Sequence, residues 1–290
     1  MNTSILTLAL LSLTGTLETP SSDVPPIPEL PTFNEAKPEE YGYQIADYAD
    51  RYNAGWVDEI WQGRMELFDA QGDSVERHVL RMLLEGEEGD KSIVKFVSPA
   101  EIKGVAALTH EHPGTSDDNW LYLPATKRVR RISGANKTAS FQGTEFTYED
   151  LSALDLGDFD WTFAEETTIE REGETLPVYV VEARPNYRDT GYSRLRIYYH
   201  KEFWRQERIE YFDKAGVHRK TSDSSRWEHL HGRFWRSMGL DMSNHQTGKR
   251  TTLSFDKVFL NLSLYTSKRT GKARANLTDE VFTTRALEQS

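Results

Sequence analysis

Apolar residues follow a helical spacing between residues 38 and 55. They recur at intervals of four, three and four, which places them on one face of a helix. Pro38 suits the first turn because its missing N–H costs nothing there, and Gly55 ends the pattern. The face is aromatic, so we predict a helix that packs on a sheet. A lid over an apolar cavity is a second interpretation that is compatible with the first. Its apolar residues are Tyr41, Ile45, Tyr48 and Tyr52.

After residue 60 the hydrophobic period changes to two, which is the period of a strand. Turns are predicted over 69–73 and 213–216, since each contains a glycine beside residues that favour turns. The last element, over 279–287, is predicted as a short helix with Thr278 as its N-cap. The predicted strands cover 64–68, 76–84, 92–97, 194–199, 205–212 and 258–264.

The number of strands indicates the fold class. Many strands joined by short hairpins, with few helices, are typical of a mainly β protein whose antiparallel sheet curls on itself. No internal repeat and no second domain boundary is visible. Residues 35–290 are therefore expected to form a single domain.

The first 34 residues differ from the rest of the chain. The apolar run over 5–17 is too short to span a bilayer and is typical of a secretory signal, which we place at residues 1–18. The alternative is a buried strand or helix. Five prolines follow by residue 31, so residues 19–34 are predicted to be an extended linker.

Charge and composition remove several classes of function. The 290 residues include 35 Lys and Arg against 46 Asp and Glu, a formal charge of −11. This argues against a nucleic-acid partner, because phosphate backbones attract basic surfaces. Cysteine is absent, which excludes disulfides, thiolate metal sites and a thiol nucleophile. It also excludes a bacterial lipid anchor, which needs a cysteine after the signal segment.

Common catalytic motifs are absent from the sequence. No G-x-S-x-G, G-x-G-x-x-G, P-loop or calcium-loop spacing occurs. The histidine pairs at 110 and 112 and at 229 and 231 would each share one face of a strand, but no third metal ligand can be named. Glu149 and Asp150 precede leucines at helical spacing, which favours an N-terminal helical turn over acid–base chemistry. We expect no catalytic residue, no metal and no cofactor.

One basic cluster stands out in this acidic chain, at Lys127–Arg131. On a strand, Arg128 and Arg130 would share one face. Arginines hold phosphate in a bidentate manner, as an anionic lipid headgroup would require. The interpretation we favour is a network of ion pairs with the acidic residues at 145, 149 and 150.

The segment from 91 to 151 carries a dense set of motifs. It resembles the bacterial outer-membrane lipoprotein-sorting family, in particular the larger LolA-like proteins associated with RND or MMPL-type lipid exporters. Weaker similarity extends the resemblance from about residue 40 to the end of the chain. The matching pieces are F-x-x-P at Phe96–Pro99, Lys103-Gly104, Trp120–Pro124, Arg130–Ile132 and Phe141–Leu151.

The resemblance implies a fold and a function. The fold is a half-open antiparallel β-barrel covered by α-helices, LolA/LolB-like, with a cavity that holds acyl chains. The function is a non-catalytic carrier of lipid or lipoprotein in the periplasm of a Gram-negative bacterium. The carrier would be soluble after signal cleavage, since the chain lacks the cysteine of the lipid-anchored acceptor.

The expected partners follow from the same resemblance. They are acyl chains, an inner-membrane RND or MMPL-type transporter and, transiently, a membrane surface, while the carrier itself is a monomer. Two alternatives remain open: a lipid-processing hydrolase, and a non-transport accessory subunit of an exporter. The residues expected at the cavity or its mouth are Tyr41, Ile45, Tyr48, Tyr52, Trp120, Tyr122, Arg128, Arg130, Phe141 and Phe146.

Overall fold

The computed structural model describes residues 25–86, 88–112, 114–115, 117–133, 136–262 and 277–289. Within these residues thirteen strands form one antiparallel sheet, in the order β6-β5-β4-β3-β2-β1-β13-β12-β11-β10-β9-β8-β7. The strands are β1 (Asp58–Phe68), β2 (Ser74–Leu84), β3 (Lys91–Ser98), β4 (Ala106–His110), β5 (Asp118–Leu123), β6 (Arg128–Ile132), β7 (Phe159–Arg171), β8 (Glu174–Pro185), β9 (Tyr192–His200), β10 (Gln206–Asp213), β11 (His218–Leu230), β12 (Phe234–Asn244) and β13 (Arg250–Leu260). The helical elements are α2 (Pro38–Asn53), α3 (Thr284–Gln289) and the 3-10 turns η2 (Glu149–Leu151) and η3 (Leu156–Asp158).

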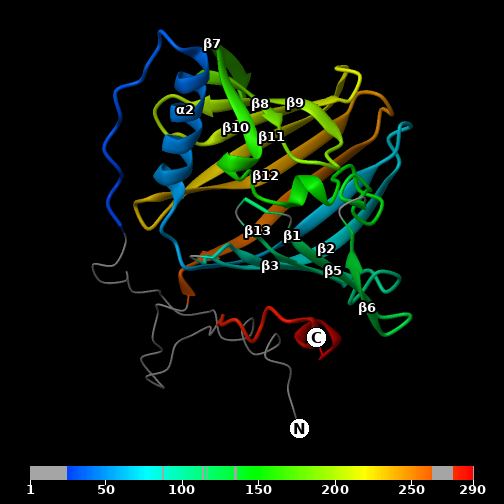
Figure 1. The fold of residues 1–290 in the computed structure, drawn as a ribbon. Coiled ribbons are helices and arrows are strands. Elements are labelled where there is room, and N and C mark those ends of the chain that lie inside the picture. Colours follow the sequence, from blue (N-terminus) through cyan, green and yellow to red (C-terminus); the bar gives the residue numbers. More distant parts are fainter. Residues whose placement is uncertain are drawn as a thin grey trace.

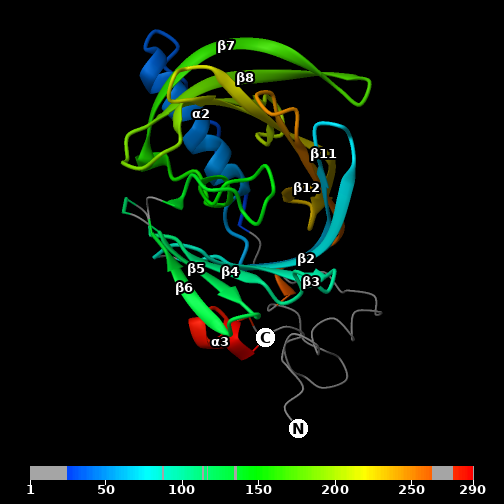
Figure 2. The same cartoon turned by 90° about the vertical axis from the view of Figure 1, so that its right-hand side faces the viewer.

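The sheet curls into an incomplete barrel. β6 and β7 stand at its two ends, and within the described residues they do not pair with each other. Two arms of the curved sheet face each other, with β7 and β8 in one and β2 to β6 in the other (Figures 1 and 2). Helix α2 lies between the arms on the concave side. The prediction of a mainly β, half-open antiparallel barrel with few helices is confirmed.

Helix α2 forms where the spacing predicted it. Pro38 occupies the first turn, and the helix ends at Asn53, just before the predicted limit. The aromatic face packs on β7 and β8, and the ring centroids of Tyr41 and Phe163 are 4.3 Å apart. Gly42 permits this approach, since a Cβ there would come within 2.5 Å of the Phe163 backbone nitrogen. Packing on a sheet, one of the two interpretations of the pattern, is therefore what the helix does.

Apolar side chains cover both faces of the arm that contains β2 to β6. The larger cluster lies on the concave face and includes α2 and strands from both arms. A smaller cluster on the other face includes residues of β2 to β5 and the segment around α3. Figure 2 shows α3 on the outer side of this arm. Because both faces are covered, β2 carries apolar residues in a near-continuous run, VLRMLL over 79–84.

Two predictions near the C-terminus need correction. The strand predicted over 258–264 ends at Leu260, because Asn261 adopts a left-handed conformation with φ of 58° and turns the chain. Position 264 lies outside the described residues. The last helix begins at Thr284 rather than at 279, and its N-cap is Thr283, whose hydroxyl oxygen accepts a hydrogen bond from the Ala286 N–H at 3.1 Å.

The structure describes only part of the N-terminal segment for which predictions were made. The predicted signal at 1–18 and the first part of the linker, 19–24, lie outside the described residues. Residues 25–34 form neither helix nor strand, and they run beside α2 (Figure 1). The Tyr48 hydroxyl donates to the Pro28 carbonyl at 3.0 Å, and the Phe33 ring lies 5.8 Å from Trp204. Among the described residues, no helix has the length and apolar character needed to cross a membrane.

Candidate functional site

Three adjoining pockets lie within the curve of the sheet. We call them the inner pocket of about 220 Å³, the middle pocket of about 400 Å³ and the outer pocket of about 630 Å³. The inner and middle pockets share Asp150, and the middle and outer pockets share Asp50 and Glu111. Together they lie in the size range of small-molecule sites.

The inner pocket has mainly apolar walls. The alternation of the strands explains this, because the side chains of one lateral row across the sheet all point to the concave face. This row ends at the rim of the sheet, on β6. Its members, from β13 to β6, are Val258, Trp61, Arg81, Val94, Ala107, Leu121 and Arg130.

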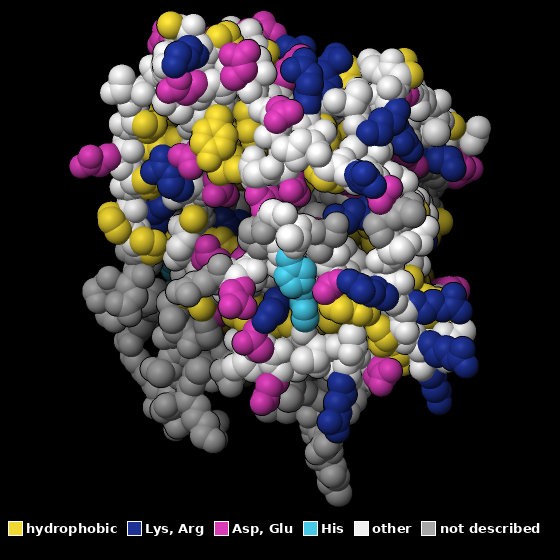
Figure 3. All heavy atoms as spheres, in the orientation of Figure 1, with side chains coloured by type: hydrophobic (Ala, Val, Ile, Leu, Met, Phe, Trp, Pro, Cys, Tyr) yellow, Lys and Arg dark blue, Asp and Glu magenta, His cyan; other side chains and the backbone are white. Residues whose placement is uncertain are grey.

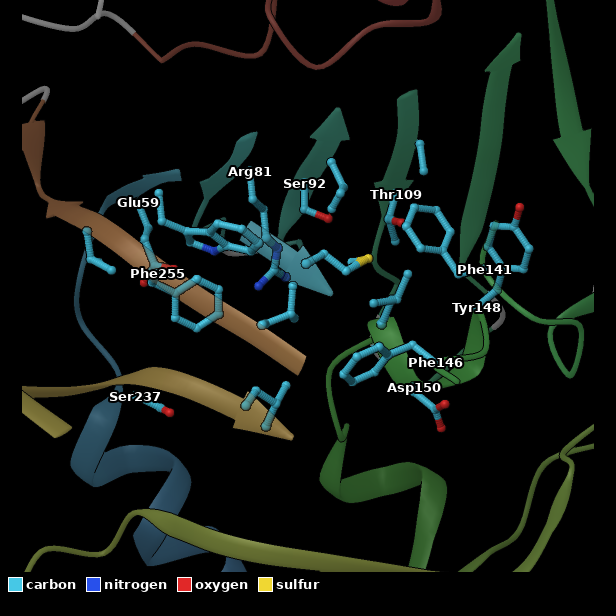
Figure 4. Close-up of a pocket in the computed structure, with 18 of the residues that line it drawn as sticks. Glu59, Arg81, Ser92, Thr109, Phe141, Phe146, Tyr148, Asp150, Ser237 and Phe255 are labelled. Atoms are coloured by element: carbon cyan, nitrogen blue, oxygen red, sulfur yellow. The ribbon is translucent and has the colours of Figure 1, made fainter. Parts of the chain in front are cut away.

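The segment between β6 and β7 closes the inner pocket from the opposite side. Phe141 and Phe146 project from it and are buried, as Figure 4 shows. The Phe141 ring stacks on Phe96 at 5.6 Å, and its N–H donates to the Phe146 carbonyl at 2.8 Å. Gly143 supplies the positive φ of 80° that this tight loop requires. The segment is thus a compact plug with its aromatic side chains in the pocket.

The plug is held by a buried ion pair. Asp150 pairs with Lys220 of β11, and both side chains are 1% exposed. The Tyr192 hydroxyl donates to Asp150 at 2.7 Å. Burial lowers the pKa of Lys220, although the Asp150 carboxylate opposes this, and burial raises the pKa of Tyr192. The pair therefore anchors the plug to strand β11.

Glu149 has structural partners as well. Its carboxylate accepts hydrogen bonds from the Tyr187 hydroxyl at 2.7 Å and from the Gly191 N–H at 2.8 Å. The predicted helical turn is the single 3-10 turn η2. Glu149 bonds to the loop between β8 and β9, and Asp150 bonds to β9 and β11, which corrects the interpretation that a helix dipole explains the two acids.

The outer pocket is rich in carboxylates. Burial, with the nearby Asp90 carboxylate, raises the pKa of Glu111 to about 7. Burial also raises the pKa of Asp50 and of Asp90. Figure 3 shows acidic side chains around the recess between the two halves of the molecule. The opening of this pocket is therefore acidic, in contrast to the apolar inner pocket.

The sequence-predicted residues divide into three groups. Phe141 and Phe146 line the inner pocket. The helix residues at 41, 45, 48 and 52 are buried in the concave cluster, but they line none of the three pockets. The α2 residues that line the outer pocket are Ala46, Ala49, Asp50 and Asn53, on an adjacent face of the helix.

The third group lies on β5 and β6. Trp120 and Tyr122 point to the outer face of the sheet and pack in the cluster around α3, one residue out of phase with the cavity row. Arg128 and Arg130 are exposed on the edge strand β6, on the concave side. The predicted ion-pair network of this cluster is wrong, since Arg131 pairs with Asp118 rather than with the acids at 145, 149 and 150.

The histidines of the sequence tests have local partners. The His110 ring bonds to the Phe282 carbonyl at 2.8 Å, and the His112 ring lies 3.3 Å from Asp118. The His229 ring stacks on Trp235 at 4.6 Å. In the part of the chain that the structure describes, no group of three His, Asp or Glu side chains is placed to hold a metal ion.

Sequence reasoning missed three charged residues of the inner pocket. Glu59 of β1 and Arg236 of β12 form an ion pair at 2.5 Å, and Arg81 of β2 lies beside them in the pocket wall. The signal for Arg81 was present in the sequence, because it interrupts the apolar run of β2. The pairing of Glu59 with Arg236 could not be found, because 177 positions separate the two residues.

The fold matches those of known structures. A crystal structure of an outer membrane lipoprotein-sorting protein domain from Vibrio parahaemolyticus is 33% identical, with a TM-score of 0.77 over 86% of this chain and 99% of that chain. The chain belongs to the outer-membrane lipoprotein-sorting protein family. A family model with the description "Uncharacterized protein" also matches, over residues 88–289.

Two further solved structures are similar to the present chain. A DUF1329 family protein from Desulfovibrio piger is 25% identical, with a TM-score of 0.75 over 87% of this chain and 99% of that one. A LolA superfamily protein from Nitrosomonas europaea is 16% identical, with a TM-score of 0.63 over 84% and 98%, and shows the fold alone. Among proteins with curated descriptions, none matches the chain.

Proposed function

We propose that this lipoprotein-sorting family member is a carrier that binds acyl chains of a lipid or lipoprotein in its concave cavity. The observation that carries the proposal is the apolar inner pocket, closed by the Phe141 and Phe146 rings and continued by two further pockets. Each buried methylene contributes about 0.8 kcal/mol. An apolar cavity therefore offsets the loss of the membrane interior and keeps an acyl chain out of water during transfer.

The carrier works in the periplasm of a Gram-negative bacterium, as a monomer that is soluble after signal cleavage. It hands its ligand between envelope membranes, or to and from an inner-membrane RND or MMPL-type transporter. Arg128 and Arg130, exposed at the rim of the sheet, suit a transient contact with anionic lipid. Uptake and release involve movement of the plug, since its Phe141 and Phe146 rings lie in the inner pocket.

A non-catalytic role is part of the proposal. The hydrolase alternative relies on His110 and Glu149, and each has a structural hydrogen bond. The two do not line a common pocket, because Glu149 lines the middle pocket and His110 lines none of the three. This supports a carrier over an enzyme.

The test is ligand recovery and uptake. The protein purified from a Gram-negative host is extracted with organic solvent and analysed by mass spectrometry, and uptake of a fluorescent fatty acid is measured. A pocket-filling variant, Leu240→Trp, is expected to lose uptake, because Leu240 lines the inner pocket. Val217→Trp, at a position 53% exposed, is the matched control and should bind normally.

The outcomes separate the candidate functions. Bound lipid, with uptake that Leu240→Trp removes, supports the carrier. Turnover of a lipid ester would favour the hydrolase. Capture of a transporter by a protein that neither contains nor takes up lipid would favour the accessory subunit and overturn the carrier.

A further inference from the structure

Arg81 lies in the cavity row on the concave face, between Trp61 and Val94. Its cross-strand neighbours are Trp61 of β1 and Val94 of β3, and all three line the inner pocket. Figure 4 shows its side chain extending from the strand into this pocket, beside Glu59 and Phe255. The guanidinium thus lies in a mainly apolar wall.

Charge counting leaves Arg81 unmatched. The inner pocket is lined by four charged side chains, and Arg236 is paired with Glu59 at 2.5 Å. Asp150 is paired with Lys220. Among the described residues, Arg81 makes no hydrogen bond and no ion pair. Its guanidinium is the one positive charge of the pocket wall, within the described part of the chain, that lacks a direct partner.

The cost of this arrangement points to a ligand. Burial lowers the pKa of Arg81, while the carboxylates of Glu59, Glu111 and Asp90 favour its charged form from a distance. Arg81 is only half-buried by accessible surface, because the surface it retains is the wall of the pocket. A partly desolvated guanidinium without a direct partner is less favourable than one whose five N–H donors are satisfied by an anion. Carboxylate and phosphate groups match that donor geometry in bidentate fashion.

We propose that Arg81 is a ligand-binding residue that holds the anionic headgroup of the carried lipid, a carboxylate or a phosphate, inside the inner pocket. This rests on the proposed carrier function and narrows its ligand to acyl chains with an acidic head. Trp61 and Val94 flank the headgroup site, so apolar contacts adjoin the ion pair. Arg130 ends the same row at the rim, at the open edge of the sheet.

The experiment compares ligands that share a chain and differ in the head. Binding of palmitic acid, hexadecanol and palmitoyl lysophosphatidic acid is measured at pH 8 by displacement of a fluorescent probe. The wild-type protein is expected to bind the better of the two acids at least 10-fold more tightly than hexadecanol. A preference for palmitic acid identifies a carboxylate ligand, and a preference for the lysophosphatidic acid identifies a phosphate headgroup.

Variants separate the role of Arg81 from a general effect of surface charge. Arg81→Met should bring the favoured acid to the affinity of hexadecanol, a loss of about 10-fold or more, with hexadecanol binding unchanged. Arg81→Lys should lose part of the preference, since a point charge replaces the bidentate fork. Arg64→Met, whose side chain is 52% exposed on β1 and lines none of the three pockets, is the control and should keep the preference.

The melting temperature of the unliganded variant shows whether a loss of binding comes from a folding defect. Arg81→Met removes a charge without a direct partner, so the unliganded variant should melt at or above the wild-type temperature. If Arg81→Met does not fold, the role of Arg81 is tested by comparing the acids with hexadecanol on the wild-type and Arg81→Lys proteins.

The two proposals fail differently. Equal binding of acids and hexadecanol by wild-type protein, or an acid preference that survives in Arg81→Met, would overturn the role of Arg81 and leave the carrier intact. Absence of binding by all three lipids would overturn the carrier and the Arg81 site together.

Discussion

At the scale of single residues, buried charged side chains join elements that are far apart in the chain. Lys220 and Asp150 lie on elements 70 positions apart and meet in the interior. Glu59 and Arg236 do the same across the sheet. Burying a charge is costly unless it is paired, so each pair constrains where its elements sit.

Lys220→Met should destabilise the protein by about 3–5 kcal/mol, because it leaves the buried Asp150 carboxylate without its cation. Urea unfolding measures the change. The control is Arg64→Met, whose side chain is 52% exposed and whose carboxylate partners lie 3.7–3.9 Å away, and which should cost about 1 kcal/mol or less. Equal costs for the two variants would contradict an anchoring role for the buried pair.

Glu111 should make stability depend on pH. Its pKa in the folded protein is about 7, above the ordinary value of 4.5, so the folded state binds more protons between these values. The free energy of unfolding therefore falls as pH rises through this window. Glu111→Gln should reduce this fall, so that the variant is more stable than wild type by about 1–3 kcal/mol at pH 8, relative to their difference at pH 4.5.

Unfolding curves at the two pH values measure the effect of Glu111. Glu101→Gln, at an exposed position, is the control and should show the wild-type pH dependence. A Glu111→Gln variant that retains the full pH dependence would show that another group causes it.

At the scale of elements, α2 and its neighbours were largely predictable, and their environments were not. The spacing of four aromatic and aliphatic residues is a local property, and it correctly predicted a helix over Pro38–Asn53. The same spacing could not show which helical face would line a pocket. The tyrosine face of α2 packs on β7. The adjacent face, with Ala46, Ala49, Asp50 and Asn53, lines the outer pocket.

Strand faces show the same limit. A strand alternates with period two, so a shift of one residue inverts which side chains reach the cavity. Trp120 and Tyr122 were expected at the cavity and lie on the outer face, while Leu121 between them lies in the cavity row. No local feature of the sequence distinguishes the two faces, because both are apolar in this arm.

Gly42→Ala should destabilise the protein by about 1–3 kcal/mol, although alanine favours a helix by about 1 kcal/mol. The added Cβ would lie 2.5 Å from backbone atoms of β7, which cannot move aside as a flexible side chain would. Tyr43→Ala, at a neighbouring position that is 46% exposed, is the control and should change stability by about 0.5 kcal/mol. Thermal and urea unfolding measure both, and a stabilised Gly42→Ala would refute the close contact.

At the scale of the whole molecule, the open barrel leaves a concave space. In a small closed barrel, side chains would fill the corresponding interior. Helix α2 and the plug occupy part of that space, and the three pockets remain. The stretch before α2 adds to this assembly, because Phe33 packs on Tyr41 and Trp204. The domain boundary predicted at residue 35 therefore cuts through packed residues.

Truncation tests that boundary. A chain that starts at residue 35 should be less stable by at least about 2 kcal/mol than one that starts at residue 25, since it loses a packed Phe side chain and the Tyr48 hydrogen bond. Unfolding in urea measures both proteins. Equal stability would show that the packed stretch contributes nothing and that the predicted boundary was adequate.

Sequence alone determined the local properties of this protein: the period of each element, several turns, the class of fold and the absence of thiol chemistry. These depend on neighbours within a few positions, so a linear pattern records them. Tertiary structure decided which face became the cavity, where the plug lies and which buried charges find partners. Those depend on contacts between residues far apart in the chain, such as Lys220 with Asp150, and on the curl of the sheet that brings Arg81 into an apolar pocket.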